Sequence, residues 1–341
     1  FEGNLWHTYL TYLLVNNENA FSTASEIRGE ISGSINELAY HDFEIFKELY
    51  DFDFVAVEKA LETSCYAMIA DYKGSDDQGK MFNKRIRDRI CELSRRLGST
   101  ESIDEFKKDM SEFYKDFGVG KLGLHKAFRV AHDEDGVHIV PITKIAHVHL
   151  SDLVGYEAAK KKLIDNTEAF VEGRPANNCL LFGDAGTGKS TSIKGILNEY
   201  YDRGLRIIEV YKHQFQDLNE VIAQIKNRNY RFIIFIDDLS FEENEVEYKF
   251  LKAVIEGGVE TRPDNVLIYA TSNRRHLIRE TWNDRTDMEH HGDIHRSDTV
   301  EEKLSLAARF GVSINFGAPT PKEYQEIVLT LARRAGITMD S

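Results

Sequence analysis

A glycine-rich stretch that ends in a lysine and a serine holds the residues of this chain best suited to chemistry. It reads Gly183-Asp-Ala-Gly-Thr-Gly-Lys189-Ser190 and fits the pattern G-x-x-x-x-G-K-[ST] without a mismatch. Glycines let a backbone curl so that successive N–H groups point at phosphate oxygens, and a helix beginning at Lys189 adds the positive end of its dipole. Lys189 supplies a cation for the β- and γ-phosphates of a nucleotide, and the Ser190 hydroxyl can ligate Mg²⁺. A chance glycine turn before a helix is the alternative, and the full match disfavours it.

Two carboxylates follow an apolar run farther along the chain. The run Arg231-Phe-Ile-Ile-Phe-Ile236 predicts a buried strand, and Asp237 and Asp238 come directly after it. Carboxylates at the end of an apolar strand are costly unless they are paired or face a metal ion. Beside a phosphate loop, we expect Asp237 at the Mg²⁺ shell and Asp238 near the attacking water. Taken alone, the same pattern also fits a strand end that turns into solvent.

A third polar residue ends another apolar run. The segment Ile268-Tyr-Ala-Thr-Ser-Asn273 predicts a strand that closes on small polar residues and an amide. An amide at such a position can orient the water that attacks a γ-phosphate. Without the other two motifs, the segment is only a strand followed by a polar loop.

Short apolar runs alternate with helical patterns over the part of the chain that holds these residues. This alternation predicts an α/β fold, with a parallel sheet covered by helices on both faces and ligands at the carboxyl ends of its strands. The predicted strands are 179–182, 205–210, 232–236 and 266–271, and the predicted helices are 158–172, 190–201, 218–227, 248–257 and 322–335.

The first 120 or so residues have helical periodicity instead. Apolar residues recur at helical spacing over 80–97 and over 102–117, the second beginning with a serine N-cap. Residues 127–142 read as a β-hairpin around an Asp-Glu-Asp-Gly turn. The polar side of 80–97 carries Arg85, Arg89 and Arg96, which fits a nucleic acid, an acidic partner or plain solvent. We therefore expect a mostly helical domain over 1–145 that ends in the hairpin, an α/β core over 146–316 and the start of a truncated helical lid over 317–341.

Composition limits the classes of function. The 341 residues include 43 basic and 57 acidic side chains, a net charge of −14. Such a charge argues against a protein that binds nucleic acid through its overall electrostatic field. Binding through a local basic patch remains an alternative. No apolar run is long enough to span a membrane, and three scattered cysteines without CxxC spacing indicate a reducing compartment, which predicts a cytoplasmic protein.

The three motifs together resemble those of the AAA+ ATPases. Gly183–Ser190 looks like Walker A, Ile233–Asp238 like Walker B and Asn273 like the sensor-1 asparagine. The resemblance extends to one bacterial family of predicted AAA+ ATPases, known as domain of unknown function eight-fifteen. The stretches that carry it are DLVGYEAAKKKLIDNTEAF, RPANNCLLFGDAGTGKST, DDLSFEE, LKAVIEGGVETRPDNVLIYATSNRRHL and GDIHRSDTVEEKLSLAARFG.

This resemblance implies a P-loop core that binds ATP or ADP with Mg²⁺ and hydrolyses ATP to change the conformation of a client or of its own ring. It implies Ser190 and Asp237 as metal ligands and Asp238 and Asn273 as catalytic residues. Arg309 lies where many AAA+ proteins carry an arginine that reaches a neighbouring subunit's nucleotide, and a surface arginine is the alternative. The residues implied to contact nucleotide are Gly183, Asp184, Ala185, Gly186, Thr187, Gly188, Lys189, Ser190 and Thr191, with Val154 and Gly155 against the adenine.

Several features leave other interpretations open. Most AAA+ Walker B motifs end Asp-Glu, and the shorter Asp238 allows slow hydrolysis, so a nucleotide-dependent scaffold or switch is the alternative function. The chain has no Asn-Lys-x-Asp motif, which a GTPase would require, and no substrate motif of a small-molecule kinase. Arg333 and Arg334 are predicted to cap a helix end. The sequence does not indicate which client the protein acts on. His290, His291, Asp293 and His295 have metal-ligand types, but their spacing favours a loop near the nucleotide.

Overall fold

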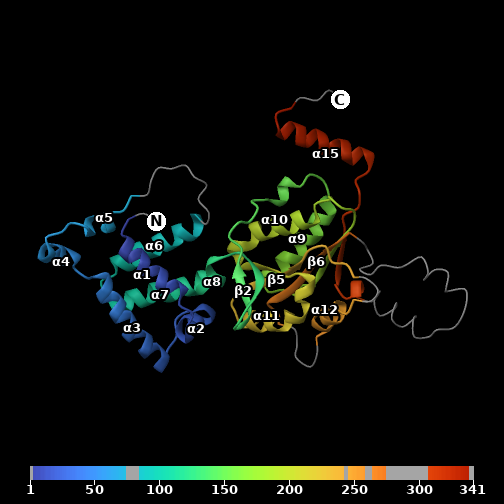
Figure 1. Cartoon of the computed structure of the whole chain (residues 1–341). Helices are drawn as coiled ribbons and strands as arrows, with labels where there is room; N and C mark the ends of the chain where they lie inside the picture. Colours follow the sequence, from blue (N-terminus) through green and yellow to red (C-terminus); the bar gives the residue numbers. More distant parts are fainter. Residues whose placement is uncertain (1–2, 74–83, 242–244, 258–262, 274–305, 338–341) are drawn as a thin grey trace, which may run out of the picture. The chain divides into compact units, whose positions relative to one another are not determined.

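The computed structural model describes residues 3–73, 84–241, 245–257, 263–273 and 306–337. The chain divides into two compact units, Phe1–His125 and Lys126–Ser341 (Figure 1). Each unit has its own hydrophobic core. In the described residues, no helix is both long enough and apolar enough to cross a lipid bilayer.

The N-terminal unit is helical, as its periodicity predicts. Helix α7 starts where the Ser102 hydroxyl accepts the Glu105 N–H at 3.2 Å, which caps the first turn. Phe106, Met110 and Phe113 of α7 are buried in the core of this unit together with Leu93 of α6. Its described helices are α1 (Leu5–Asn16), α2 (Ala20–Arg28), α3 (Ser34–Tyr50), α4 (Phe54–Leu61), α5 (Tyr66–Ala70), α6 (Lys84–Ser99), α7 (Ile103–Phe117) and α8 (Gly120–Leu124).

The second unit contains a mostly parallel sheet, which confirms the predicted α/β class. Its described strands are ordered β2-β1-β4-β5-β6-β3-β7, and all neighbours except β1 and β2 run parallel. Strand β6 lies between β3 and β5, so the carboxyl ends of these three strands meet at one edge of the sheet. The strands are β1 (Ala127–Asp133), β2 (Gly136–Pro141), β3 (Cys179–Phe182), β4 (Leu205–Glu209), β5 (Arg231–Ile236), β6 (Val266–Ser272) and β7 (Val312–Asn315).

Helices cover both faces of the sheet, as a parallel sheet of apolar strands requires. Helices α9 and α10 lie on one face, and α11 and α12 lie on the other (Figure 1). Leu181, Ile233 and Tyr269 are fully buried in one core cluster with side chains of α9 and α10. The remaining described elements are η1 (Leu150–Asp152), α9 (Glu157–Val171), α10 (Lys189–Tyr200), η2 (Tyr201–Arg203), η3 (Lys212–Asp217), α11 (Leu218–Ile225), α12 (Glu247–Glu256) and α15 (Pro321–Arg334).

The predicted hairpin forms, but it does not belong to the N-terminal domain. Ala127, Phe128 and Arg129 of β1 pair in parallel with Ile207–Glu209 of β4, so the hairpin extends the sheet of the second unit. The division between the compact units therefore falls after His125 and not after residue 145. Local alternation predicts that a hairpin exists, but it carries no information about which distant strand its edge will pair with.

Candidate functional site

The glycine-rich stretch connects β3 to α10 at the carboxyl edge of the sheet. Gly183, Gly186 and Gly188 have φ values of 139°, 76° and 90°, which side chains with a Cβ rarely adopt. Helix α10 then begins at Lys189. The strand, loop and helix predicted around this motif are therefore all present, with N–H groups of a helix N-terminus at the end of the loop.

Two of these glycines also lie against other segments of the unit. A Cβ atom on Gly183 would collide with the carbonyl oxygen of Phe316, which follows β7. A Cβ atom on Gly188 would collide with the side chain of Leu153. The absence of side chains at these positions thus lets the loop pack between the segment before α9 and the segment after β7.

We expect Gly183→Ala to lower the free energy of unfolding by about 3 kcal/mol, because it combines backbone strain with overlap against a main-chain oxygen. Gly186→Ala is the matched control, since no atom lies within 4 Å of its added Cβ, and we expect only the backbone cost of about 1 kcal/mol. Urea denaturation measures both values. Equal losses in the two variants would contradict the packing described for Gly183.

Lys189 is nearly buried at the start of α10, with 6% of its surface exposed. Its ammonium group donates to the carbonyl oxygens of Gly183 at 2.9 Å and Asp184 at 2.6 Å. Burial lowers the pKa of Lys189, and the nearby carboxylates of Asp184, Asp238 and Asp237 oppose this shift. The loop therefore holds a desolvated cation inside its own curve, where a phosphate oxygen can replace a carbonyl as its partner.

The three sequence motifs meet in one hydrogen-bond network. Asp237 Oδ1 accepts from the Ser190 hydroxyl at 2.6 Å and from the Thr271 hydroxyl at 2.6 Å. Thr271 Oγ1 in turn accepts the Asp238 N–H at 2.9 Å, and the Asn273 amide donates to Asp238 Oδ1 at 2.8 Å. The structure thus brings together Ser190 in the first turn of α10 with Asp237, Asp238 and Asn273, which directly follow two neighbouring strands.

Asp238 has a backbone conformation that the sequence does not reveal. Its φ is 53°, in the left-handed region, and its carboxylate is exposed at the sheet edge. A left-handed aspartate costs free energy and persists only where its surroundings hold it. Such a residue directly after a buried strand is consistent with a functional position.

The segment 153–155, for which the resemblance implies an adenine contact, lies beside the loop, with the Leu153 side chain against Gly188. The buried ammonium of Lys160 donates to the Leu153 carbonyl at 2.9 Å, which fixes the entry to α9. Val154 and Gly155 are half-buried, and a Cβ on Gly155 would lie 3.5 Å from Ile327 Cδ1 of α15. These contacts place a partly apolar surface next to the loop, which is the kind of surface a nucleobase requires.

The segment that leads into α15 is tied to the same region. The Ala318 N–H donates to Asp184 Oδ2 at 2.7 Å, and the Tyr156 hydroxyl donates to the Gly317 carbonyl at 3.2 Å. Burial raises the pKa of Tyr156, with smaller contributions from Glu323 and Asp184. Neither Tyr156 nor Lys160 was a sequence candidate, because a tyrosine and a lysine near a helix start carry no distinctive pattern.

Two of the three candidate arginines, Arg309 and Arg334, contact other residues of their own unit. Arg309 Nη1 lies 2.6 Å from Glu256 Oε1 of α12. Arg334 donates to the carbonyl oxygens of Ser151 and Asp152 at 2.9 and 3.2 Å, so it caps the η1 turn and not its own helix. Arg333 is exposed.

The donor atoms of the network suit the ligands implied by the motif. Ser190 and Asp237 offer a hydroxyl and a carboxylate oxygen, and oxygen donors are the ligands that Mg²⁺ prefers. The residues Asp184, Ala185, Gly186, Thr187, Gly188 and Thr191 form the rest of the loop and its first helical turn. In this loop the Thr187 hydroxyl donates to the Asp184 carbonyl at 2.8 Å, which closes the curve around Lys189.

Two further sequence signals lie apart from the residues described above or outside the described part of the chain. His290, His291, Asp293 and His295 lie outside the described residues, and the described part of the chain contains no cluster of three or more metal-ligating side chains. On the basic side of α6, Arg96 pairs with Asp109 and Glu112 of α7, and Arg89 lies 4.4 Å from the centre of the Phe117 ring. These two arginines are therefore occupied within their own unit.

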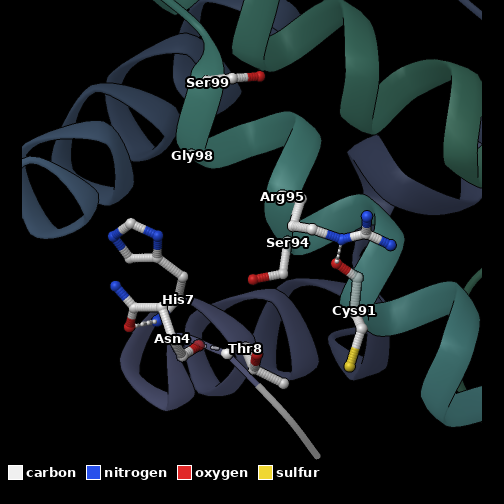
Figure 2. A pocket seen from close by; sticks show the side chains of 9 residues that line it. Asn4, His7, Thr8, Cys91, Ser94, Arg95, Gly98 and Ser99 are labelled. Atoms are coloured by element: carbon white, nitrogen blue, oxygen red, sulfur yellow. Dashed lines mark hydrogen bonds between the residues drawn. The ribbon is translucent and has the colours of Figure 1, made fainter. Parts of the chain in front are cut away.

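A cavity of about 300 Å³ lies in the N-terminal unit between α1 and α6 (Figure 2). Asn4, His7 and Thr8 of the α1 region face Ser94 and other α6 residues across it. His7 Nε2 forms a 2.8 Å hydrogen bond with the Tyr50 carbonyl, and burial lowers the pKa of His7. This polar lining is already used in contacts that hold the helices together, so we assign the cavity no ligand.

The parallel sheet, the glycine-rich loop and the acidic strand end define an α/β protein with the P-loop NTPase fold. Residues 123–341 match the sequence model of the family described as "Protein of unknown function (DUF815)", and the chain belongs to this family. The family resemblance predicted from the sequence is thus confirmed.

Similarity to named proteins covers smaller parts of the chain than the family model does. The chain is 32% identical over 81 residues to the replication factor C large subunit of Staphylothermus marinus, which is 24% of this chain and 18% of that protein. Among solved structures, the Thermotoga maritima RuvB Holliday junction branch migration motor matches 56% of this chain and 55% of its own, with 20% identity and a TM-score of 0.37. A crystal structure of DnaI matches 51% of this chain and 89% of its own, with 18% identity and a TM-score of 0.35. The chain therefore spans less than a fifth of that curated relative and about half of RuvB.

Proposed function

We propose that this protein binds ATP with Mg²⁺ at Gly183–Thr191 and hydrolyses it to ADP and phosphate to drive a conformational change. The observation that carries the proposal is the hydrogen-bond network that joins Ser190, Asp237, Asp238 and Asn273 next to Lys189. A phosphate cradle, oxygen donors for a cation, a carboxylate and a water-orienting amide within one network are the parts that phosphoryl transfer to water requires.

Each residue then has a defined task. Lys189 and the loop N–H groups hold the phosphates, and Ser190 and Asp237 hold Mg²⁺, which neutralises phosphate charge when bound. Asp238 accepts a proton from the attacking water, and the Asn273 amide, 2.8 Å from Asp238 Oδ1, orients that water. Val154 and Gly155 supply an apolar contact for the adenine.

Steady-state release of phosphate from ATP tests this proposal directly. We expect turnover that requires Mg²⁺ and stops when a chelator removes it. A wild-type protein that binds ATP but releases phosphate no faster than a Lys189→Ala variant would replace hydrolysis with the second candidate, a nucleotide-dependent scaffold or switch. Two observations favour this second candidate. The side chain of Asp238 is one methylene shorter than the glutamate of most Walker B motifs, and the Asn273 amide already donates to its carboxylate.

We also propose that the active unit is a ring in which Arg309 contributes to the site of a neighbouring copy. In this chain Arg309 pairs with Glu256, and both side chains are partly exposed, at 40% and 30%. An ion pair of this exposure contributes about 0–1 kcal/mol, so a neighbouring phosphate can displace Glu256 at little cost. Contacts in which one face meets a different face close into rings or continue as filaments.

Mixing two inactive variants tests the contribution of Arg309 in trans. Arg309→Ala subunits keep Lys189, and Lys189→Ala subunits keep Arg309, so an equal mixture should rebuild about a quarter of the wild-type sites by random assembly. Phosphate release from the mixture, compared with each variant alone, measures this recovery. We also expect wild-type specific activity to rise with protein concentration.

Arg174→Ala is the matched control, because Arg174 is also an exposed arginine that pairs with a glutamate, Glu172, at 2.6 Å. It should retain wild-type turnover on its own. An Arg309→Ala variant as active as Arg174→Ala, or a mixture no more active than its components, would show that Arg309 is an ordinary surface residue.

A further inference from the structure

Thr271 occupies the centre of the network, although no motif points to it. It lies on β6 with 2% of its surface exposed, one strand away from Asp237 and Asp238. Its hydroxyl donates to Asp237 Oδ1 at 2.6 Å and accepts the Asp238 N–H at 2.9 Å. One hydroxyl has one proton and two lone pairs, so it can make both bonds at once.

The backbone of Thr271 makes a third contact with the same segment. Its carbonyl oxygen accepts the Leu239 N–H at 2.7 Å. Thr271 therefore binds the N–H groups on both sides of the Asp238 α-carbon, and Asp238 is the residue with a left-handed φ of 53°. A strained conformation persists where neighbouring contacts determine it, and here Thr271 supplies two of those contacts.

We propose that Thr271 is a positioning residue that sets the metal-binding carboxylate of Asp237 and the base Asp238 relative to each other. This inference rests on the proposed hydrolysis of ATP and deepens it. Thr271 itself touches neither phosphate nor water in the proposal, and it acts through the two aspartates. Because the two acids have different tasks, one hydroxyl that holds both couples cation binding to proton transfer.

The role requires the hydroxyl and not the volume of the side chain. Thr271→Val keeps the shape but removes both hydrogen bonds, which leaves the Asp238 N–H without its acceptor and one side of Asp237 without its donor. Thr271→Ser keeps the hydroxyl and loses only a methyl group. Removing a residue that hydrogen-bonds a metal ligand, without itself contacting the metal, typically lowers metal affinity or activity by about 10–100-fold.

The experiment compares Thr271→Val, Thr271→Ser and a matched control in the full chain. Thr167→Val is that control, because Thr167 is fully buried in the same unit and its hydroxyl bonds the Leu163 carbonyl at 2.8 Å and the Tyr269 hydroxyl at 3.0 Å, away from the aspartates. Three quantities are measured for each variant: kcat for phosphate release, the Kd of ATP by calorimetry without Mg²⁺, and the Mg²⁺ concentration that gives half of the cation-induced change in ATP affinity. Thermal denaturation checks folding, and Thr271→Ala replaces the valine variant if that variant does not fold.

We expect Thr271→Val to lower kcat by about 10–100-fold and to raise the required Mg²⁺ concentration, with the metal-free Kd of ATP changed by less than about threefold. Thr271→Ser and Thr167→Val should stay within about threefold of wild type. A Thr271→Val variant with wild-type kcat and Mg²⁺ dependence overturns the inference, as does a serine variant as impaired as the valine variant. If the wild type binds ATP without hydrolysing it, the proposed function fails, and the Mg²⁺ dependence of ATP binding alone then decides the role of Thr271.

Discussion

Lys189→Ala is expected to weaken ATP binding by at least about tenfold and to reduce phosphate release to background. In the described residues, Lys189 is the side-chain cation bonded inside the curve of the loop, where it holds the Gly183 and Asp184 carbonyls. Alanine removes that charge and leaves the phosphates facing carbonyl oxygens and the carboxylates of Asp237 and Asp238. Isothermal titration calorimetry with ATP measures the loss.

Lys194→Ala controls for this change, since Lys194 lies exposed on the same helix, α10. It should keep the wild-type affinity. Lys189→Met retains the length of the side chain without its charge, so it separates the loss of a cation from a collapse of the loop. ATP affinity within about threefold of wild type in folded Lys189→Ala and Lys189→Met would contradict the assignment of Gly183–Ser190 as a phosphate loop.

The elements that position this site could be predicted because their signals are local. Each predicted strand of the core ends within one residue of the observed strand, and each helix except α11 does the same. Apolar runs bounded by glycine or acidic residues define a buried strand without reference to the rest of the chain. Since the carboxyl ends of parallel strands share an edge, the spacing of three motifs along the sequence was enough to predict that they meet.

Features that depend on distant pairing could not be predicted in the same way. Strand β7, Val312–Asn315, buries only Ile314, and it becomes a strand by pairing with β3 at the edge of the sheet. The local pattern of the hairpin likewise does not predict which unit it joins, because its partner Ile207–Glu209 lies far along the chain. Such pairings are decided by tertiary packing and leave little trace in the local pattern.

The position of Thr271 on β6 does carry a signal in the sequence. Residues two apart on a strand face the same side of a sheet, so a candidate Asn273 implies that residue 271 also points toward the acidic strand end. The left-handed φ of Asp238 has no such signal, because aspartate is common after strands in ordinary conformations. The site is thus predictable as a set of side chains, whereas the contacts that fix their geometry require the folded sheet.

Asp238→Asn is expected to leave ATP affinity within about threefold of wild type while lowering turnover by about 100-fold or more. The amide has the shape of the carboxylate, its oxygen can still accept from Asn273, and asparagine tolerates the left-handed backbone that Asp238 adopts at φ 53°. The amide, however, cannot accept a proton from the attacking water as the carboxylate does. Calorimetry and steady-state phosphate release on the same preparation separate the two effects.

Two neighbouring variants sharpen this test. Asp238→Glu keeps a carboxylate and adds the methylene that most AAA+ Walker B motifs carry, so it should be more active than Asp238→Asn despite the backbone strain of a left-handed glutamate. Asp237→Asn should instead raise the Mg²⁺ concentration needed for activity, because Asp237 bonds the Ser190 hydroxyl at the proposed cation site. Equal turnover in wild type and Asp238→Asn would remove Asp238 as the base. Wild type and Asp238→Asn would in that case both still bind ATP. The comparison therefore distinguishes an error about the role of Asp238 from an error about the nucleotide site as a whole.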